Sequence, residues 1–140
     1  MEFTRRKVLA IGSGTIAAAA LTGLPAFASA TDDLIMELTG NADVGSGALT
    51  LTAPEIAENG NTVPIEVAAP GAASITIFAD GNPVPAVATF NFGPLNASRS
   101  ASTRIRLAKS QNVVAIAKME DGTFQRAEAA VKVTIGGCGG

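Results

Sequence analysis

Along most of the chain after residue 47, hydrophobic and polar positions alternate with a period of two. This alternation is typical of β-strands with one buried face, because successive side chains of a strand point to opposite sides. Seven strands are predicted, and their alternating apolar positions are Leu49 and Leu51; Val63, Ile65 and Val67; Ile75 and Ile77; Ala88, Phe90 and Phe92; Ile105 and Leu107; Val113, Ala115 and Ala117; and Val131, Val133 and Ile135. Seven short strands at this spacing favour an all-β fold, an immunoglobulin-like β-sandwich.

Turn-forming residues separate these strands, at 58–61, 80–83, 92–94 and 120–122. The last of them contains Asp-Gly, the dipeptide that most strongly favours a tight turn between antiparallel strands. A β-hairpin is therefore predicted around residues 120–122.

Some apolar residues fall on the face opposite the main hydrophobic stripe, namely Phe78, Val114 and Ile116. Apolar residues on both faces indicate a strand that is buried twice. Two explanations remain open: a covered second face, as at a subunit interface, or ordinary irregularity of a sandwich.

Residues 31–40 are the one helical candidate. Thr31 or Asp32 is suited to cap its start, and Gly40 is suited to end it. The segment is predicted to form two turns at most, so its stability depends on packing against the rest of the protein.

Residues 1–30 have the composition of an export signal. Arg5 and Arg6 precede an uncharged stretch at 8–24, and small residues follow it. This order is typical of a secretory signal peptide. The arginine pair matches the twin-arginine type, which exports folded proteins to the bacterial periplasm. The alternative is an uncleaved N-terminal membrane anchor.

Cleavage after Ala28 and cleavage after Ala30 both fit the small-residue pattern. We expect a cleaved signal at 1–30, one β-sandwich domain at 31–135 and a C-terminal arm at 136–140. The exported protein is expected in the periplasm, without membrane attachment.

Composition excludes much of the familiar enzyme chemistry. The 140 residues include one cysteine and no histidine, tryptophan or tyrosine. No Ser-His-Asp triad, Cys-His pair or histidine-built metal site can form within the chain, and no internal disulfide is available. The formal net charge of −2 argues against nucleic-acid binding. We expect no cofactor, no metal site and no enzymatic activity.

The chain ends on Gly136, Gly137, Cys138, Gly139 and Gly140. Glycine has no Cβ and reaches most of backbone space, so this segment is predicted to be a flexible arm with a thiol near its tip. Three residues beyond the last strand span roughly 10 Å when extended, which is enough to enter a narrow cleft of another protein. No histidine or second cysteine activates the thiol, so it is suited to covalent attachment of a group rather than to catalysis.

The Gly-Gly-Cys-Gly-Gly end resembles the C-terminal arm of the SoxY family, the sulfur-carrier subunits of the periplasmic thiosulfate-oxidising (Sox) system. The stretches 54–64 and 102–115 also resemble segments of that family, and a twin-arginine signal fits it. The resemblance covers nearly all of the chain after the signal.

The resemblance implies a periplasmic carrier that pairs with a SoxZ-like subunit and is not itself an enzyme. It implies that a c-type cytochrome joins thiosulfate oxidatively to Cys138, and that a hydrolase then releases sulfate. A sulfane dehydrogenase or another Sox protein takes the remaining sulfur. Promiscuous docking of this kind is expected to be weak and to depend mostly on the arm.

One rival reading stays open. An exported immunoglobulin-like module for structure or interaction would use Cys138 for an intermolecular disulfide. Elsewhere in the chain, Arg104 and Arg106 share a strand face that suits either a small anion or simple solvation.

Overall fold

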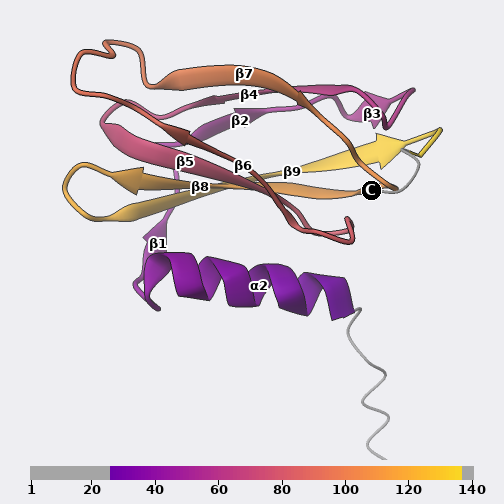
Figure 1. Cartoon of the computed structure of the whole chain (residues 1–140), viewed down its shortest axis with the longest axis horizontal. Coiled ribbons are helices and arrows are strands. Elements are labelled where there is room, and N and C mark those ends of the chain that lie inside the picture. Colours follow the sequence, from indigo (N-terminus) through magenta and orange to yellow (C-terminus); the bar gives the residue numbers. More distant parts are fainter. Residues whose placement is uncertain (1–25, 137–140) are drawn as a thin grey trace, which may run out of the picture.

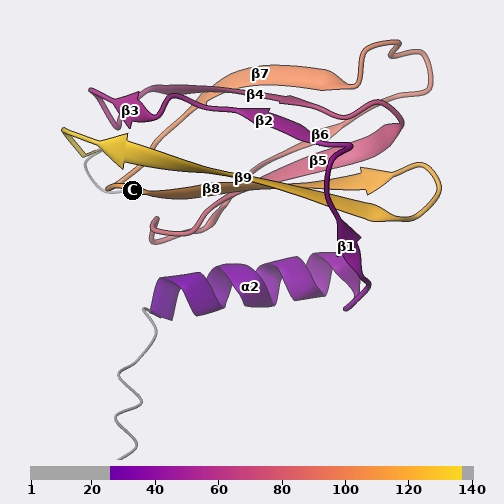
Figure 2. The ribbon, with the colours of Figure 1, turned by 180° about the vertical axis from the view of Figure 1, so that it is seen from behind.

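The computed structural model describes residues 26–136, with side chains from residue 30, and shows two β-sheets packed face to face. A helix lies against the outer face of the larger sheet, so the molecule has three layers (Figures 1 and 2). The predicted all-β sandwich with a short N-terminal helix is confirmed.

The larger sheet has six strands and the smaller sheet has three. In the larger sheet the order is β1 (Val44–Gly45), β9 (Phe124–Val133), β8 (Gln111–Met119), β5 (Ala72–Ala79) and β6 (Ala86–Asn91), and β3 (Ile56–Ala57) also pairs with β9. In the smaller sheet the order is β2 (Thr50–Thr52), β4 (Val63–Ala68) and β7 (Ser100–Ile105).

The seven predicted strands all exist, although several bounds differ by a few residues. Their inward-facing side chains form one aliphatic core, in which Ile75, Ile77 and Val113 of the larger sheet are buried in the same cluster as Val63 and Val67 of the smaller one. Alternation thus placed most of the core correctly, because the pleat sends every second side chain inward. The prediction was wrong for Ile135, which follows the end of β9 and is 67% exposed.

Two strands were not predicted from the sequence pattern. β1 and β3 have two residues each, and both pair in parallel with the outer edge of β9. A two-residue strand has no periodicity to detect, and its partner is remote in sequence. Together they cover both ends of an edge that would otherwise be open.

The hairpin between β8 and β9 is confirmed. Gly122 has a φ of 85°, which favours glycine. Asp121 Oδ1 accepts hydrogen bonds from the Thr123 backbone N–H at 2.9 Å and from the Thr123 hydroxyl at 2.6 Å. These two bonds, the hydroxyl's first, hold the pKa of Asp121 below its ordinary value of 3.8.

Helix α2 (Ala26–Thr39) covers the second apolar face. Ile35 lies in a buried cluster with Phe78, Val114, Ile116 and Phe124. The chain's own helix therefore explains the residues that the sequence left open to two readings. The reading of a covered second face is thus confirmed, and the cover is this helix instead of a second subunit.

The helix is longer than predicted, with 14 residues instead of two turns. It begins at Ala26, and the alanines in residues 26–30 favour helix. It ends as expected at Gly40, whose φ is 63°. The buried positions Thr31, Ile35 and Thr39 all follow both predicted cleavage points, so the predicted cleavage would leave these helix contacts in place.

Candidate functional site

The last strand, β9, leads towards the predicted attachment residue Cys138. Its C-terminal end lies at the same end of the sandwich as β3 and the β5–β6 turn (Figures 1 and 2). We call this the arm end and define it by residues 55–60, 80–85, 106–111 and 134–136.

Most of the predicted arm lies outside the described residues, namely Gly137, Cys138, Gly139 and Gly140. The structure does describe Gly136 and the residues that hold it. The geometry of the site is therefore the geometry of the point where the arm leaves the body.

A serine side chain extends the pairing of β9 beyond the end of β8. The backbone N–H of Val133 donates to the Ser110 hydroxyl at 2.8 Å, and that hydroxyl lies 3.4 Å from the Val133 carbonyl oxygen as a weaker donor. The backbone register between β8 and β9 starts only at the pair Gln111 and Val131. Ser110 thus bonds Val133, which lies two residues beyond the last backbone pair of the two strands.

The other edge of β9 is held by the segment around β3. The backbone N–H of Lys132 donates to the Glu55 carbonyl at 2.9 Å, and that of Thr134 donates to the Ala57 carbonyl at 3.0 Å. The Thr134 hydroxyl also donates to the Glu58 carbonyl at 3.0 Å. Hydrogen bonds therefore hold the C-terminal end of β9 along both of its edges.

Gly60 links the end of β9 to the segment after β7. Its N–H donates to the Ile135 carbonyl at 2.7 Å, while its own carbonyl accepts from the Leu107 N–H at 2.8 Å. Gly60 is buried, and Leu107 is fully buried in the core. Ile135 is therefore fixed through its backbone, although its side chain points into solvent.

Gly136 lies directly against the carbonyl group of Ala108. A Cβ at this position would collide with the Ala108 carbonyl oxygen. Glycine is required here for close approach of two backbones, in addition to any freedom it supplies to the arm. The body thus fixes the chain up to Gly136, two residues before Cys138.

Asn82 supports the segment on which Gly136 rests. It is only 5% exposed. Its amide group donates to the Arg106 carbonyl at 2.8 Å, and its Oδ1 accepts from the Ala108 N–H at 2.9 Å and from Gln111 Nε2 at 2.9 Å. One buried side chain therefore orders the whole 106–111 segment.

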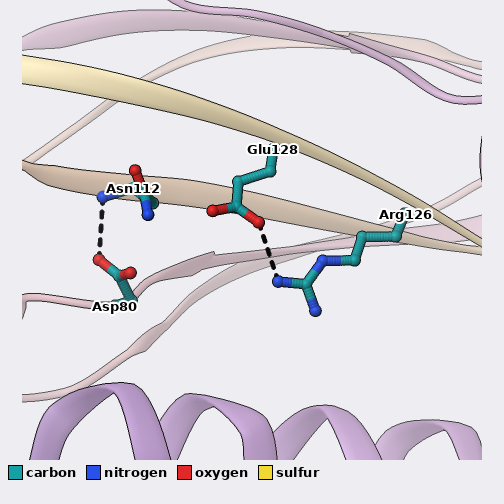
Figure 3. A network of polar contacts seen from close by, with 4 residues as sticks. All are labelled: Asp80, Asn112, Arg126 and Glu128. Carbon is teal, nitrogen blue, oxygen red and sulfur yellow. Dashed lines mark hydrogen bonds and ion pairs between the residues drawn. The ribbon is translucent and has the colours of Figure 1, made fainter. Parts of the chain in front are cut away.

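The β5–β6 turn is also tied to the start of β8. Asp80 and Asn112 bond reciprocally: Asp80 Oδ1 accepts from the Asn112 N–H at 2.9 Å, and the Asp80 N–H donates to the Asn112 carbonyl at 3.2 Å. Figure 3 shows this pair beside the ion pair of Arg126 and Glu128, whose closest atoms are 2.9 Å apart. The exposed ion pair contributes little to the stability of the fold, whereas the hydrogen bonds of Asp80 position the β5–β6 turn.

The sequence did not identify Asn82, Ser110 or Thr134 as site residues. Asn82 stands in a turn motif, and the other two are ordinary polar residues near strand ends. Their only sequence signal was their place at the boundaries of predicted strands. Hydrogen-bonding partners that are far along the chain gave them their roles.

Arg104 and Arg106 remain exposed in the fold. Arg104 Nη1 lies 3.4 Å from the Thr62 hydroxyl, and Arg104 borders an open groove of about 560 Å³ beside Pro64 and Glu66. The groove lies on the outer face of the smaller sheet. Arg106 supplies its carbonyl to Asn82, so its backbone role is structural.

Within residues 26–136, no cluster of three or more acidic, cysteine or histidine side chains is arranged to hold a metal ion. In the same described part of the chain, no helix has both the length and the apolar character that crossing a membrane requires.

The fold and the arm end define a class of protein. It is a small β-sandwich in which the last strand is followed by a terminal segment that contains a cysteine. The model of the family "Sulfur oxidation protein SoxY" matches residues 35–138, a match that continues through Cys138. The chain belongs to the SoxY family.

A solved structure supports this membership. The sulfur carrier protein SoxY from Chlorobium limicola f thiosulfatophilum is 41% identical, with a TM-score of 0.66, over 77% of this chain and 99% of that one. A superoxide reductase (neelaredoxin) from Ignicoccus hospitalis shares only the fold, at 18% identity and a TM-score of 0.55, over 62% of this chain and 80% of that one. No curated protein matches the chain.

Proposed function

We propose that this protein holds thiosulfate-derived sulfur covalently on Cys138 and presents it to separate enzymes in the periplasm. Membership of a family of sulfur carriers supports a carrier role. The observation that carries the residue assignment is the family match through Cys138. It is supported by a body whose backbone hydrogen bonds extend to Ile135, with Gly136 close against Ala108.

The attachment is an oxidation. The Cys138 thiolate and thiosulfate form a sulfur–sulfur bond and release two electrons, which a c-type cytochrome accepts. Water then attacks the sulfur of the terminal sulfonate group, and the bond between that sulfur and the sulfane sulfur breaks. Sulfate and two protons are released, and a persulfide anion remains on Cys138. The carrier contributes no acid or base to either step, so each partner enzyme supplies the chemistry.

The composition of the chain suits such an adduct. A thiol attacks a sulfur–sulfur bond and displaces one of its sulfurs. Cys138 is the single cysteine, so no second thiol of the chain can remove the attached group. Absence of a second cysteine therefore preserves the intermediate between enzymes.

The proposal includes a SoxZ-like partner subunit and export through the twin-arginine route. Co-expression of the full chain with such a subunit should yield a heterodimer in the periplasmic fraction. Replacing Arg5 and Arg6 by lysine should retain the protein in the cytoplasm if the route is correct.

The decisive experiment is intact-mass spectrometry of the exported protein from thiosulfate-grown cells, without and with reductant. We expect adducts of sulfur or thiosulfate that map to Cys138 and disappear on reduction. Cys138→Ser should carry none. A clean mass, or only a disulfide-linked homodimer, would refute the carrier proposal and favour an interaction module that is crosslinked through Cys138.

A further inference from the structure

We propose that the arm end of the sandwich is itself a docking surface, on which Ile56, Val84 and Ile135 contact the sulfate-releasing hydrolase that acts on Cys138. The inference rests on the proposed function and adds the surface by which this enzyme recognises the body of the carrier. The partner is an enzyme whose narrow active-site channel opens through an apolar mouth.

Cys138 is tethered close to the body of the protein. The backbone is fixed up to Gly136 by Gly60 and by the contact with Ala108. Cys138 is two residues further along, so its Cα lies at most about 7 Å from that of Gly136. An enzyme that brings its reacting atoms to the sulfur must also bring the mouth of its channel against the arm end. The proposed surface therefore adds contacts with the body to the recognition that is expected from the arm.

The arm end exposes apolar surface. Large hydrophobic side chains are exposed at this end at three positions: Ile56 is 59% exposed, Val84 is 67% exposed and Ile135 is 67% exposed. They come from β3, the β5–β6 turn and the end of β9, which gather at the same end of the sandwich (Figures 1 and 2). The core of a protein interface is commonly apolar, with polar residues around it.

The three apolar side chains lie on backbone that is hydrogen-bonded into the arm end. Ile56 lies in β3, Ile135 is held by Gly60, and the turn with Val84 is held by Asn82 and Asp80. A preorganised surface loses little conformational entropy when a partner docks, which favours a small and transient interface.

The test uses steady-state kinetics of the carrier heterodimer with its sulfate-releasing hydrolase. Ile56→Thr, Val84→Thr and Ile135→Thr keep the β-branched shape and remove apolar surface. We expect the triple variant to raise the KM for the carrier about tenfold, with kcat changed less than twofold. Leu95→Thr is the matched control, since Leu95 is 97% exposed in the loop between β6 and β7 at the opposite end.

Three outcomes would overturn the docking surface. One is a KM within twofold of that of the parent chain. Another is an equal effect of Leu95→Thr. The third is loss of the heterodimer in size-exclusion chromatography, which would assign these residues to the partner subunit. Cys138→Ser, measured in parallel, separates the two proposals: if it retains turnover, the carrier role fails whatever the triple variant does.

Discussion

Gly136 lies against the carbonyl oxygen of Ala108, closely enough that no side chain fits between the two backbones. Ala108 is in turn bonded through its N–H to Asn82, at 2.9 Å. The arm therefore starts from a defined point on the body, two residues before the cysteine.

Gly136→Ala should displace the start of the arm, because its methyl group collides with Ala108. Overpacking of this kind lowers the free energy of unfolding by about 1 to 3 kcal/mol. We expect turnover by the partner hydrolase to fall about tenfold as the sulfur is misplaced. Gly93→Ala is the control, since a Cβ there meets no atom within 4 Å. Equal turnover of both variants would contradict a fixed exit point.

Ser110→Ala should loosen the end of β9. The variant loses the hydrogen bond from the Val133 N–H, which contributes about 1 kcal/mol. Amide hydrogen exchange of Val133 and Thr134 should accelerate, while exchange in the middle of β9 stays unchanged. Ser98→Ala, at an exposed serine that bonds only to Ser100, should leave these amides as they are.

Asn82→Ala should destabilise the arm end more than any exposed substitution. The variant leaves the Arg106 carbonyl and the Ala108 N–H without their partner in a nearly buried place. We expect the free energy of unfolding to fall by about 2 to 3 kcal/mol in urea titrations followed by circular dichroism. Asn96→Ala, at an exposed loop position, should lower the free energy of unfolding by less than about 0.5 kcal/mol. A smaller cost at Asn82 than at Asn96 would refute its central role.

Phe124→Ala should weaken the layer between helix α2 and the larger sheet. Phe124 is 7% exposed and packs in the cluster with Ile35. Replacing a buried phenylalanine by alanine lowers the free energy of unfolding by about 3 kcal/mol. Here the lost packing should weaken the contact between helix α2 and the sheet. Amide exchange should rise first in α2. Unchanged protection of the helix would show that this cluster does not hold it.

The turn at Asp121 should give a small pH dependence of stability. Hydrogen bonds from Thr123 hold the folded pKa of Asp121 below 3.8. A depressed carboxyl pKa stabilises the fold above the unfolded value and loses that contribution as the pH falls through the folded value. Wild type and Asp121→Asn should therefore differ in unfolding free energy by a constant amount at neutral pH, and this difference should shrink below pH 3.8. A difference that is independent of pH would contradict the assignment.

Preferences of individual residues and short segments made a large part of the fold predictable from the sequence. Alternation of apolar side chains follows from the strand pleat, so it located the seven main strands and the aliphatic core. The Asp121–Gly122 turn was identified because few residue pairs adopt that backbone at low cost. The thiol among glycines at 136–140 stood out on chemistry alone, and it stays a prediction because Cys138 lies outside the described residues.

Only the tertiary structure decided which distant residues became neighbours. β1 and β3 are too short to have a period, and they exist because β9 offers them an open edge. Phe78 and Phe124 are 46 positions apart, and helix α2 covers both. The contacts of Asn82 with Ala108, and of Ala108 with Gly136, likewise join segments that are remote along the chain. Sequence patterns report a residue's own preferences, whereas these contacts arise from the three-dimensional packing that brings such segments together.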